Sequence, residues 1–104
     1  MEQAVIVHLR LRDGRFGSPG ERKTIQALED QLLLAINGAS AGEFDGDEFG
    51  GGECVLYMYG PDADRLYGAI EPILKAAPAG LRGYAIKRYG EARDPTSLEA
   101  RVTW

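Results

Sequence analysis

The first apolar segment of the chain, residues 4–12, alternates between two kinds of residue. One set is apolar throughout and consists of Val5, Val7, Leu9 and Leu11, and the residues between them are Ile6, His8, Arg10 and Arg12. Successive side chains of a β-strand point to opposite faces of the sheet. This period of two therefore predicts a strand with one buried face.

A helical period follows the first strand. Apolar residues recur at spacings of three and four, at Ile25, Leu28, Leu32 and Ile36, which marks one apolar face of a helix. Ser18 precedes Pro19 and stands three residues before Glu21, a pattern typical of a capped helix start. Asn37-Gly38 offers a left-handed stop. We predict a helix over residues 19–37.

The middle of the chain predicts two further strands. Residues 43–47 are mostly polar and favour a short edge strand, and three glycines at 50–52 favour a loop. Residues 54–59 alternate again and predict a central strand. Its inward set is Cys54, Leu56 and Met58, and its outward set is Val55, Tyr57 and Tyr59.

The remaining residues complete the pattern. A second helix is predicted from Pro61, with an inward face formed by Leu66, Ile70, Ile73 and Leu74. A strand over residues 83–89 follows, with Ile86 inward and Lys87 and Tyr89 outward. Residues 91–104 form a C-terminal extension, in which the alternation over 98–104 predicts a possible fifth strand. This strand either flanks the same sheet or pairs with another molecule.

The predicted order of elements, βαββαβ, is that of a ferredoxin-like α+β sandwich. Right-handed crossovers fix the strand order as 4-1-3-2 in an antiparallel sheet, with both helices on one face. At 104 residues the chain has the usual size of one domain. We assign residues 1–104 to a single ferredoxin-like domain.

Composition and charge exclude several classes of function. No apolar run approaches the roughly 20 residues of a membrane span, and Met1-Glu2-Gln3 does not begin like a secretory signal. We therefore expect a soluble protein of the cytoplasm with no membrane partner. The net charge of −4 makes a nucleic acid an unlikely partner, because phosphate backbones bind positive surfaces.

Metal binding is also disfavoured. Cys54 is the only cysteine, so no internal disulfide and no cysteine-based zinc site is expected. Residues 45–50 begin like a calcium loop, but Phe49 stands at its fifth position and Leu56 at its twelfth, where oxygen ligands are required. We predict no metal and no cofactor.

The predicted register gathers charged and aromatic side chains on the sheet face that the helices leave open. From one edge to the other these are Lys87 and Tyr89, then His8, Arg10 and Arg12, then Val55, Tyr57 and Tyr59, then Glu43, Asp45 and Asp47. Aromatic residues between edges of opposite charge are typical of a protein interface. We predict a non-catalytic interaction module that binds a protein partner or forms a homodimer, with the basic edge of one copy near the acidic edge of the other.

Two alternatives remain open. The first is a sensor of a small molecule or anion, with a polar pocket near His8, Arg10 and Tyr57. In this alternative the glycine-rich loop at 12–20 could also hold an anion, aided by Arg15 and Lys23. The second, less favoured, is an enzyme with an acid/base site near His8. No serine or cysteine nucleophile is assigned to the face of His8, so we name no catalytic residue.

Three stretches carry a resemblance to known proteins. They are Gly42 to Glu53, Leu56 to Asp64, and Lys87-Arg88-Tyr89-Gly90. Together they resemble a small bacterial family of uncharacterised proteins with a ferredoxin-like fold. The resemblance implies a compact bacterial domain, and it implies no activity and no catalytic residue.

Overall fold

The computed structural model describes residues 2–78 and 80–104 as one α+β unit. Its elements are β1 (Gln3–Arg10), α1 (Pro19–Ala39), β2 (Glu43–Gly50), β3 (Glu53–Gly60), α2 (Ala63–Ala76), β4 (Gly83–Arg88) and β5 (Glu99–Val102). Every strand pairing is antiparallel. Within this described part of the chain, no helix is both long and apolar enough to cross a membrane.

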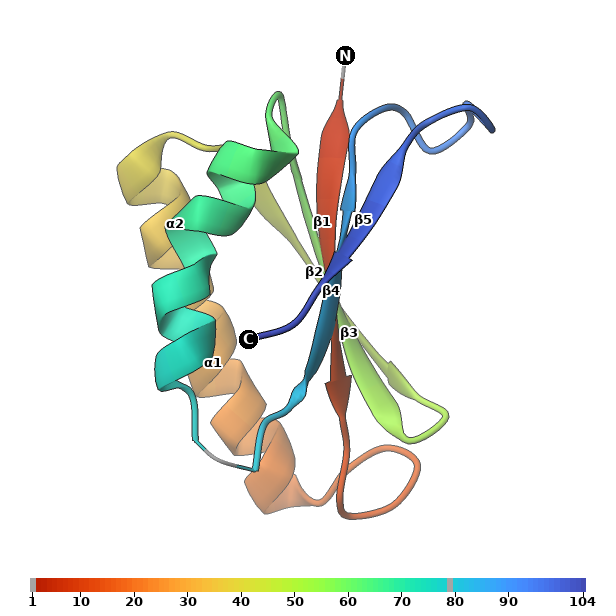
Figure 1. The fold of residues 1–104 in the computed structure, drawn as a ribbon. Helices are drawn as coiled ribbons and strands as arrows, with labels where there is room; N and C mark the ends of the chain where they lie inside the picture. The colour runs from red at the N-terminus through yellow and green to blue at the C-terminus, as the bar shows by residue number, and fades with distance from the viewer. Residues whose placement is uncertain (1, 79) are drawn as a thin grey trace.

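The sheet has five strands in the order β2-β3-β1-β4-β5. Both helices cover one face and leave the other open (Figure 1). The order differs from the predicted four-strand arrangement because the sheet continues past β4 with β5. The C-terminal extension therefore supplies a strand that flanks its own sheet, which is one of the two predicted alternatives.

The core lies between the sheet and the helices, and the predicted inward sets of β1 and β3 are confirmed as buried. The start of α1 is confirmed too, since the Ser18 hydroxyl accepts a hydrogen bond from the Glu21 amide at 3.1 Å. The helix ends two residues later than predicted, at Ala39. Gly38 remains helical, and Ser40 adopts the left-handed conformation with φ of 49°.

The register of β4 differs from the prediction by one residue. Ala85 lies opposite Val7 and faces the helices, and Ile86 lies opposite Ile6 on the open face. Lys87 consequently faces the helices as well. The prediction was wrong because it took Ile86 for a core residue, whereas its apolar partner Ile6 lies on the open face.

A β-bulge changes the faces of β2. Phe44 and Phe49 both pack against the core, although strict alternation would place residues five positions apart on opposite faces. The register shifts between Phe44 and Gly46, and one extra residue in a strand restores the common face. Gly46 has a φ of 152° at this point, a backbone region that glycine adopts most readily.

The bulge also corrects the predicted acidic edge. Asp47 lies opposite Leu56 and so faces the helices. Asp45 lies in the bulge and has no directly opposed residue. The acidic side chains of β2 that share the open face are Glu43 and Glu48.

Candidate binding site on the open sheet face

Directly opposed residues arrange the open face in rows that cross the strands. The middle row runs through Gly46, Tyr57, Ile6, Ile86 and Arg101, from β2 to β5. We call Tyr57, Ile6 and Ile86 the apolar row, and all of them are partly exposed. The row ends in a glycine without a side chain at β2 and in an arginine at β5.

His8 lies in the neighbouring row and is held from two sides. Its Nδ1 is 3.2 Å from Oε1 of Glu53, and its ring stacks on Tyr84 with centroids 4.6 Å apart and planes at 9°. The side chain of His8 is 22% exposed. A carboxylate on one ring nitrogen and an aromatic ring against one face fix the orientation of the imidazole.

Arg101 completes this arrangement from the next strand. Its Cζ lies 3.7 Å from the centroid of the Tyr84 ring, which is the geometry of a cation–π contact. β4 carries Tyr84 and lies between β1 and β5. We call His8, Tyr84 and Arg101 the stack; it joins three neighbouring strands, and Glu53 continues it onto β3.

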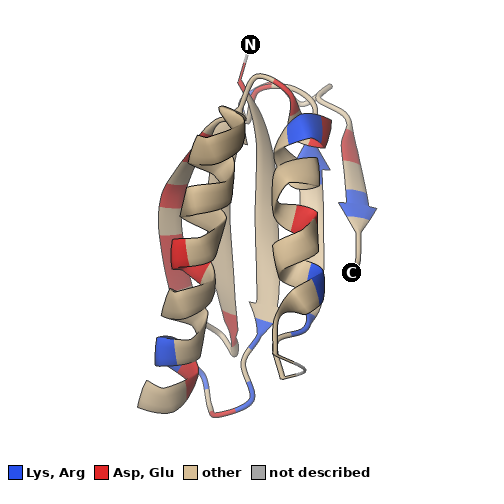
Figure 2. Ribbon diagram, turned by 90° about the vertical axis from the view of Figure 1, so that its left-hand side faces the viewer, with Lys and Arg blue, Asp and Glu red and all other residues tan. Residues whose placement is uncertain are grey.

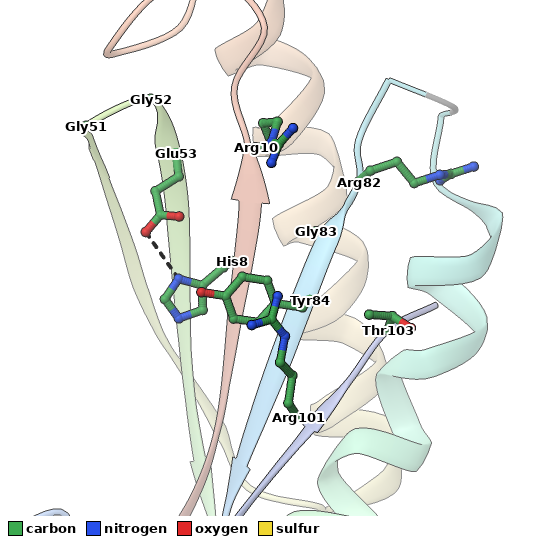
Figure 3. Close-up of a pocket in the computed structure, with 10 residues that line it drawn as sticks. All are labelled: His8, Arg10, Gly51, Gly52, Glu53, Arg82, Gly83, Tyr84, Arg101 and Thr103. Carbon is green, nitrogen blue, oxygen red and sulfur yellow. Dashed lines mark hydrogen bonds and ion pairs between the residues drawn. The ribbon is translucent and has the colours of Figure 1, made fainter.

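The stack borders a cavity of about 480 Å³, which we call the corner cavity (Figure 3). It lies where the end of β1 meets the β2–β3 hairpin and the start of β4. Its lining consists of His8, Arg10, Gly51, Gly52, Glu53, Arg82, Gly83, Tyr84, Arg101 and Thr103. Glycines form much of the wall and add no side chains that could fill the space.

Positive charge dominates the corner cavity. Its lining holds three arginines and one glutamate, although the chain as a whole carries a net charge of −4. Within residues 2–78 and 80–104, none of the cavity arginines lies within 4.0 Å of a carboxylate oxygen. The one glutamate, Glu53, is directed to His8. The arrangement is therefore suited to an anion.

Only part of the predicted open-face set lies at this site. His8 and Arg10 line the corner cavity, and Tyr57 and Tyr59 lie on the same face outside it. Arg12 lies beyond the end of β1, and its backbone amide donates to the Glu21 carboxylate at 2.8 Å. Its predicted place in the sheet face was wrong because the strand ends at Arg10.

Lys87 and Tyr89 lie on the helix side instead of the open face. The Lys87 ammonium and the Tyr89 hydroxyl both donate to Oδ1 of Asp64, at 2.9 and 2.6 Å. Hydrogen bonds from Tyr89 and then Lys87 lower the pKa of Asp64. The one-residue shift in β4 explains the error, and these side chains fasten β4 and the chain after it to the first turn of α2.

Two amides at the start of the glycine-rich loop are engaged by a side chain of the protein itself. The amides of Arg12 and Asp13 donate to the carboxylate of Glu21, at 2.8 and 3.3 Å. The carboxylate of Glu21 thus already fills the place of an anion at these two amides. Arg15 and Lys23 are exposed, and an external anion would have to displace this internal carboxylate.

A buried acidic group lies on the helix side, between α1 and β2. Glu29 is 6% exposed, and burial, followed by a hydrogen bond with Asp47, raises its pKa to about 8. Oε2 of Glu29 has no hydrogen-bond partner among the described residues, so no donor stabilises the charged form at this oxygen. Burial likewise raises the pKa of Cys54 to about 12, which keeps it a thiol at neutral pH.

The prediction missed Tyr84, Arg82 and Glu53, and it did not connect Arg101 with His8. The sequence predicted a possible fifth strand over residues 98–104, which include Arg101, but it did not identify the strand beside it. Placing Gly83 rather than Ile86 on the core-facing side of β4 would have brought Tyr84 to the face of His8.

Comparison with known proteins adds no relative to this picture, and the resemblance to small bacterial proteins stays a prediction. No family model, no curated protein and no solved structure matches the chain.

Proposed function

We propose that this protein is a non-catalytic interaction domain of ferredoxin-like fold, located in the cytoplasm, that pairs with a second copy through the open face of its sheet. The observation that carries the proposal is the middle row, from Gly46 to Arg101. β1 is the central strand of the sheet. A two-fold axis parallel to β1 therefore lays each half of this row on the opposite half of the second copy.

The row is self-complementary under this symmetry. Ile6 packs on its own counterpart, and Ile86 of one copy packs on Tyr57 of the other. Arg101 reaches the position of Gly46, where no side chain stands in its way. An apolar centre with a polar rim is the usual anatomy of a protein interface.

Charge favours the same orientation. Figure 2 shows acidic segments along β2 at one edge of the sheet, and one acidic and one basic segment on β5 at the opposite edge. The basic residue of β5 is Arg101, and the proposed axis brings it near Glu48 of the other copy. A two-fold axis perpendicular to the strands would instead place like edges together, and the resulting repulsion disfavours it.

The chemistry of the face supports a binding role over a catalytic one. Cys54 points toward the helices and is buried as a thiol, so it offers no nucleophile to the open face. The imidazole of His8 is engaged by Glu53 and Tyr84, which is a fixed arrangement rather than one directed at a nucleophile.

Light scattering over a dilution series tests the proposal. The parent chain should have the mass of a dimer at high concentration, and Tyr57→Glu should raise the dimer dissociation constant by about thirtyfold or more, since a buried interface aromatic contributes upward of about 2 kcal/mol. Leu34→Glu is the matched control, because Leu34 is 72% exposed on α1, on the opposite side of the sheet.

Circular dichroism of each variant establishes that it remains folded. A parent chain that is monomeric at every concentration would reject the proposal. So would a folded Tyr57→Glu variant that dimerises as well as the parent.

A further inference from the structure

We infer that the corner cavity is a binding site for the phosphate group of a small molecule. The inference goes beyond the proposed self-association; the two share Arg101, and the other cavity residues lie outside the middle row. Arg10, Arg82 and Arg101 come from the end of β1, the residue before β4, and β5, respectively, and all three line one cavity. Figure 3 shows Arg101 against Tyr84 and the guanidinium of Arg82 directed outward, away from the other two arginines.

The cavity arginines keep most of their hydrogen-bonding capacity. Arg82 donates one hydrogen bond, from Nη1 to the carbonyl of Leu81 at 3.2 Å. Arg101 lies on the Tyr84 ring, a contact that leaves the N–H groups at the rim of its guanidinium directed outward. A guanidinium presents five donors in a fixed plane. The site can therefore offer many donors without breaking an existing ion pair.

The charge of the site favours a phosphate over a single carboxylate. The guanidinium groups outnumber the lining carboxylate by three to one, so a monoanion would leave positive charge unbalanced. A phosphate monoester carries about −1.5 to −2 charges at neutral pH and presents three acceptor oxygens. Arginine is the residue best matched to this group, because its N–H donors fit two oxygens at once.

Glu53 and His8 act as positioning residues. Glu53 is bound to Nδ1 of His8, and among the described residues it forms no ion pair with the cavity arginines. His8 supports the ring of Tyr84 by stacking, and Tyr84 in turn supports Arg101. This chain of contacts holds a guanidinium at the cavity before any ligand arrives, which reduces the entropy cost of binding.

The backbone keeps the cavity open. Gly51 and Gly52 form the turn between β2 and β3 with φ of 61° and 83°, which side chains rarely adopt. A Cβ on Gly83 would overlap the carbonyl of His8. Larger residues at these lining positions are thus disfavoured by the fold itself.

The test is an NMR titration of the full chain with inorganic phosphate, phenyl phosphate and succinate, each matched in ionic strength with sodium chloride. Both phosphates should produce saturable shifts in the Nε–H signals of Arg82 and Arg101, and succinate should bind at least about tenfold more weakly. Tighter binding of phenyl phosphate than of inorganic phosphate would identify a phosphate ester, and the reverse would identify the free ion.

Matched variants assign the binding to the cavity. Arg101→Gln and Arg82→Gln should each weaken phosphate binding about tenfold or more, because each removes charge-assisted hydrogen bonds. Arg15→Gln makes the same change of charge on the exposed loop and should have no effect. Arg101→Lys keeps the charge but loses the planar fork, and it should bind phosphate less tightly than the parent.

Three outcomes would overturn the inference: no saturable shift beyond that caused by sodium chloride, succinate binding as tightly as phosphate, or an equal loss with Arg15→Gln. The titration is repeated on Tyr57→Glu, which lies outside the cavity lining. Phosphate binding by this variant separates the fate of the phosphate site from that of the proposed dimer.

Discussion

Glu29 on α1 is buried, and burial, followed by interaction with Asp47 on β2, raises its pKa to about 8. Glu29 in an unfolded chain has an ordinary pKa near 4.5. Between these values the folded state binds the extra proton, so stability is fully present below about pH 4.5 and falls as the pH rises toward 8. Urea unfolding of the parent should show a loss of a few kcal/mol across this range.

Glu29→Gln should remove this contribution to the pH dependence. Glutamine fills the same space and can donate to Asp47 without titrating. Asp30→Asn is the comparison variant, because the charge of Asp30, an exposed neighbour on the same helix, is the smallest contributor to the raised pKa of Glu29; it should change the pH dependence of stability much less than Glu29→Gln. Identical slopes for the parent and Glu29→Gln between pH 5 and 8 would contradict the assignment.

Asp64 provides a second titration with the opposite sign. The pKa of Asp64 is lower in the folded state than in the unfolded chain. Its contribution to stability is therefore present above the pKa of the unfolded state, and it is lost as the pH falls through the pKa of the folded state. Tyr89→Phe and Lys87→Gln should each raise the pKa of Asp64, since each removes a hydrogen bond that lowers it. Carboxyl carbon shifts measured by NMR between pH 2 and 6 report the pKa of Asp64 in both variants. An unchanged pKa in either variant would count against the contact that it removes.

Gly83 and Gly68 should respond in opposite ways to alanine. A Cβ on Gly83 would meet the backbone of β1 at the carbonyl of His8, so Gly83→Ala should destabilise the fold by about 1–3 kcal/mol or more. Gly68 lies within α2 with open space around the added Cβ, and Gly68→Ala should stabilise by about 0.5–1 kcal/mol. Thermal unfolding compares the stability of the two variants with that of the parent. If Gly83→Ala is as stable as the parent, β4 and β1 lie farther apart than described.

The proposed dimer predicts a charge exchange between β5 and β2. Arg101→Glu and Glu48→Arg should each weaken dimerisation, because each places like charges across the interface. The double variant should recover much of the lost affinity, and analytical ultracentrifugation can compare all four proteins. Additive losses in the double variant would show that these residues do not face each other.

The sequence predicted best those elements whose core pattern is uninterrupted. β1 and β3 alternate without a break, so their buried and open sets followed from period alone. Ser18 and Glu21 marked the start of α1 because their hydrogen bond depends on local spacing. His8 and Arg10 were placed on the correct face for the same reason.

The errors arose where distant parts of the chain decide the register. Ile86 is apolar on an open face because Ile6 lies opposite, a pairing that no local pattern reveals. The bulge before Gly46 is required by the burial of both Phe44 and Phe49, and it turned Asp47 away from the predicted edge. Since Tyr84 and Arg101 reach His8 only through the pairing of β4 with its neighbours, most of the corner cavity could not be predicted.

The acidic, bulged β2 has a further consequence for the behaviour of the protein at high concentration. β2 is one of the two edges of the sheet, and an exposed edge is a template on which other chains add strands and form fibrils. Its bulge interrupts the row of backbone donors and acceptors, while its carboxylates repel the same strand of another molecule. Growth edge to edge is thereby suppressed along β2, which leaves the face of the sheet, where we propose the dimer, as the surface open to association.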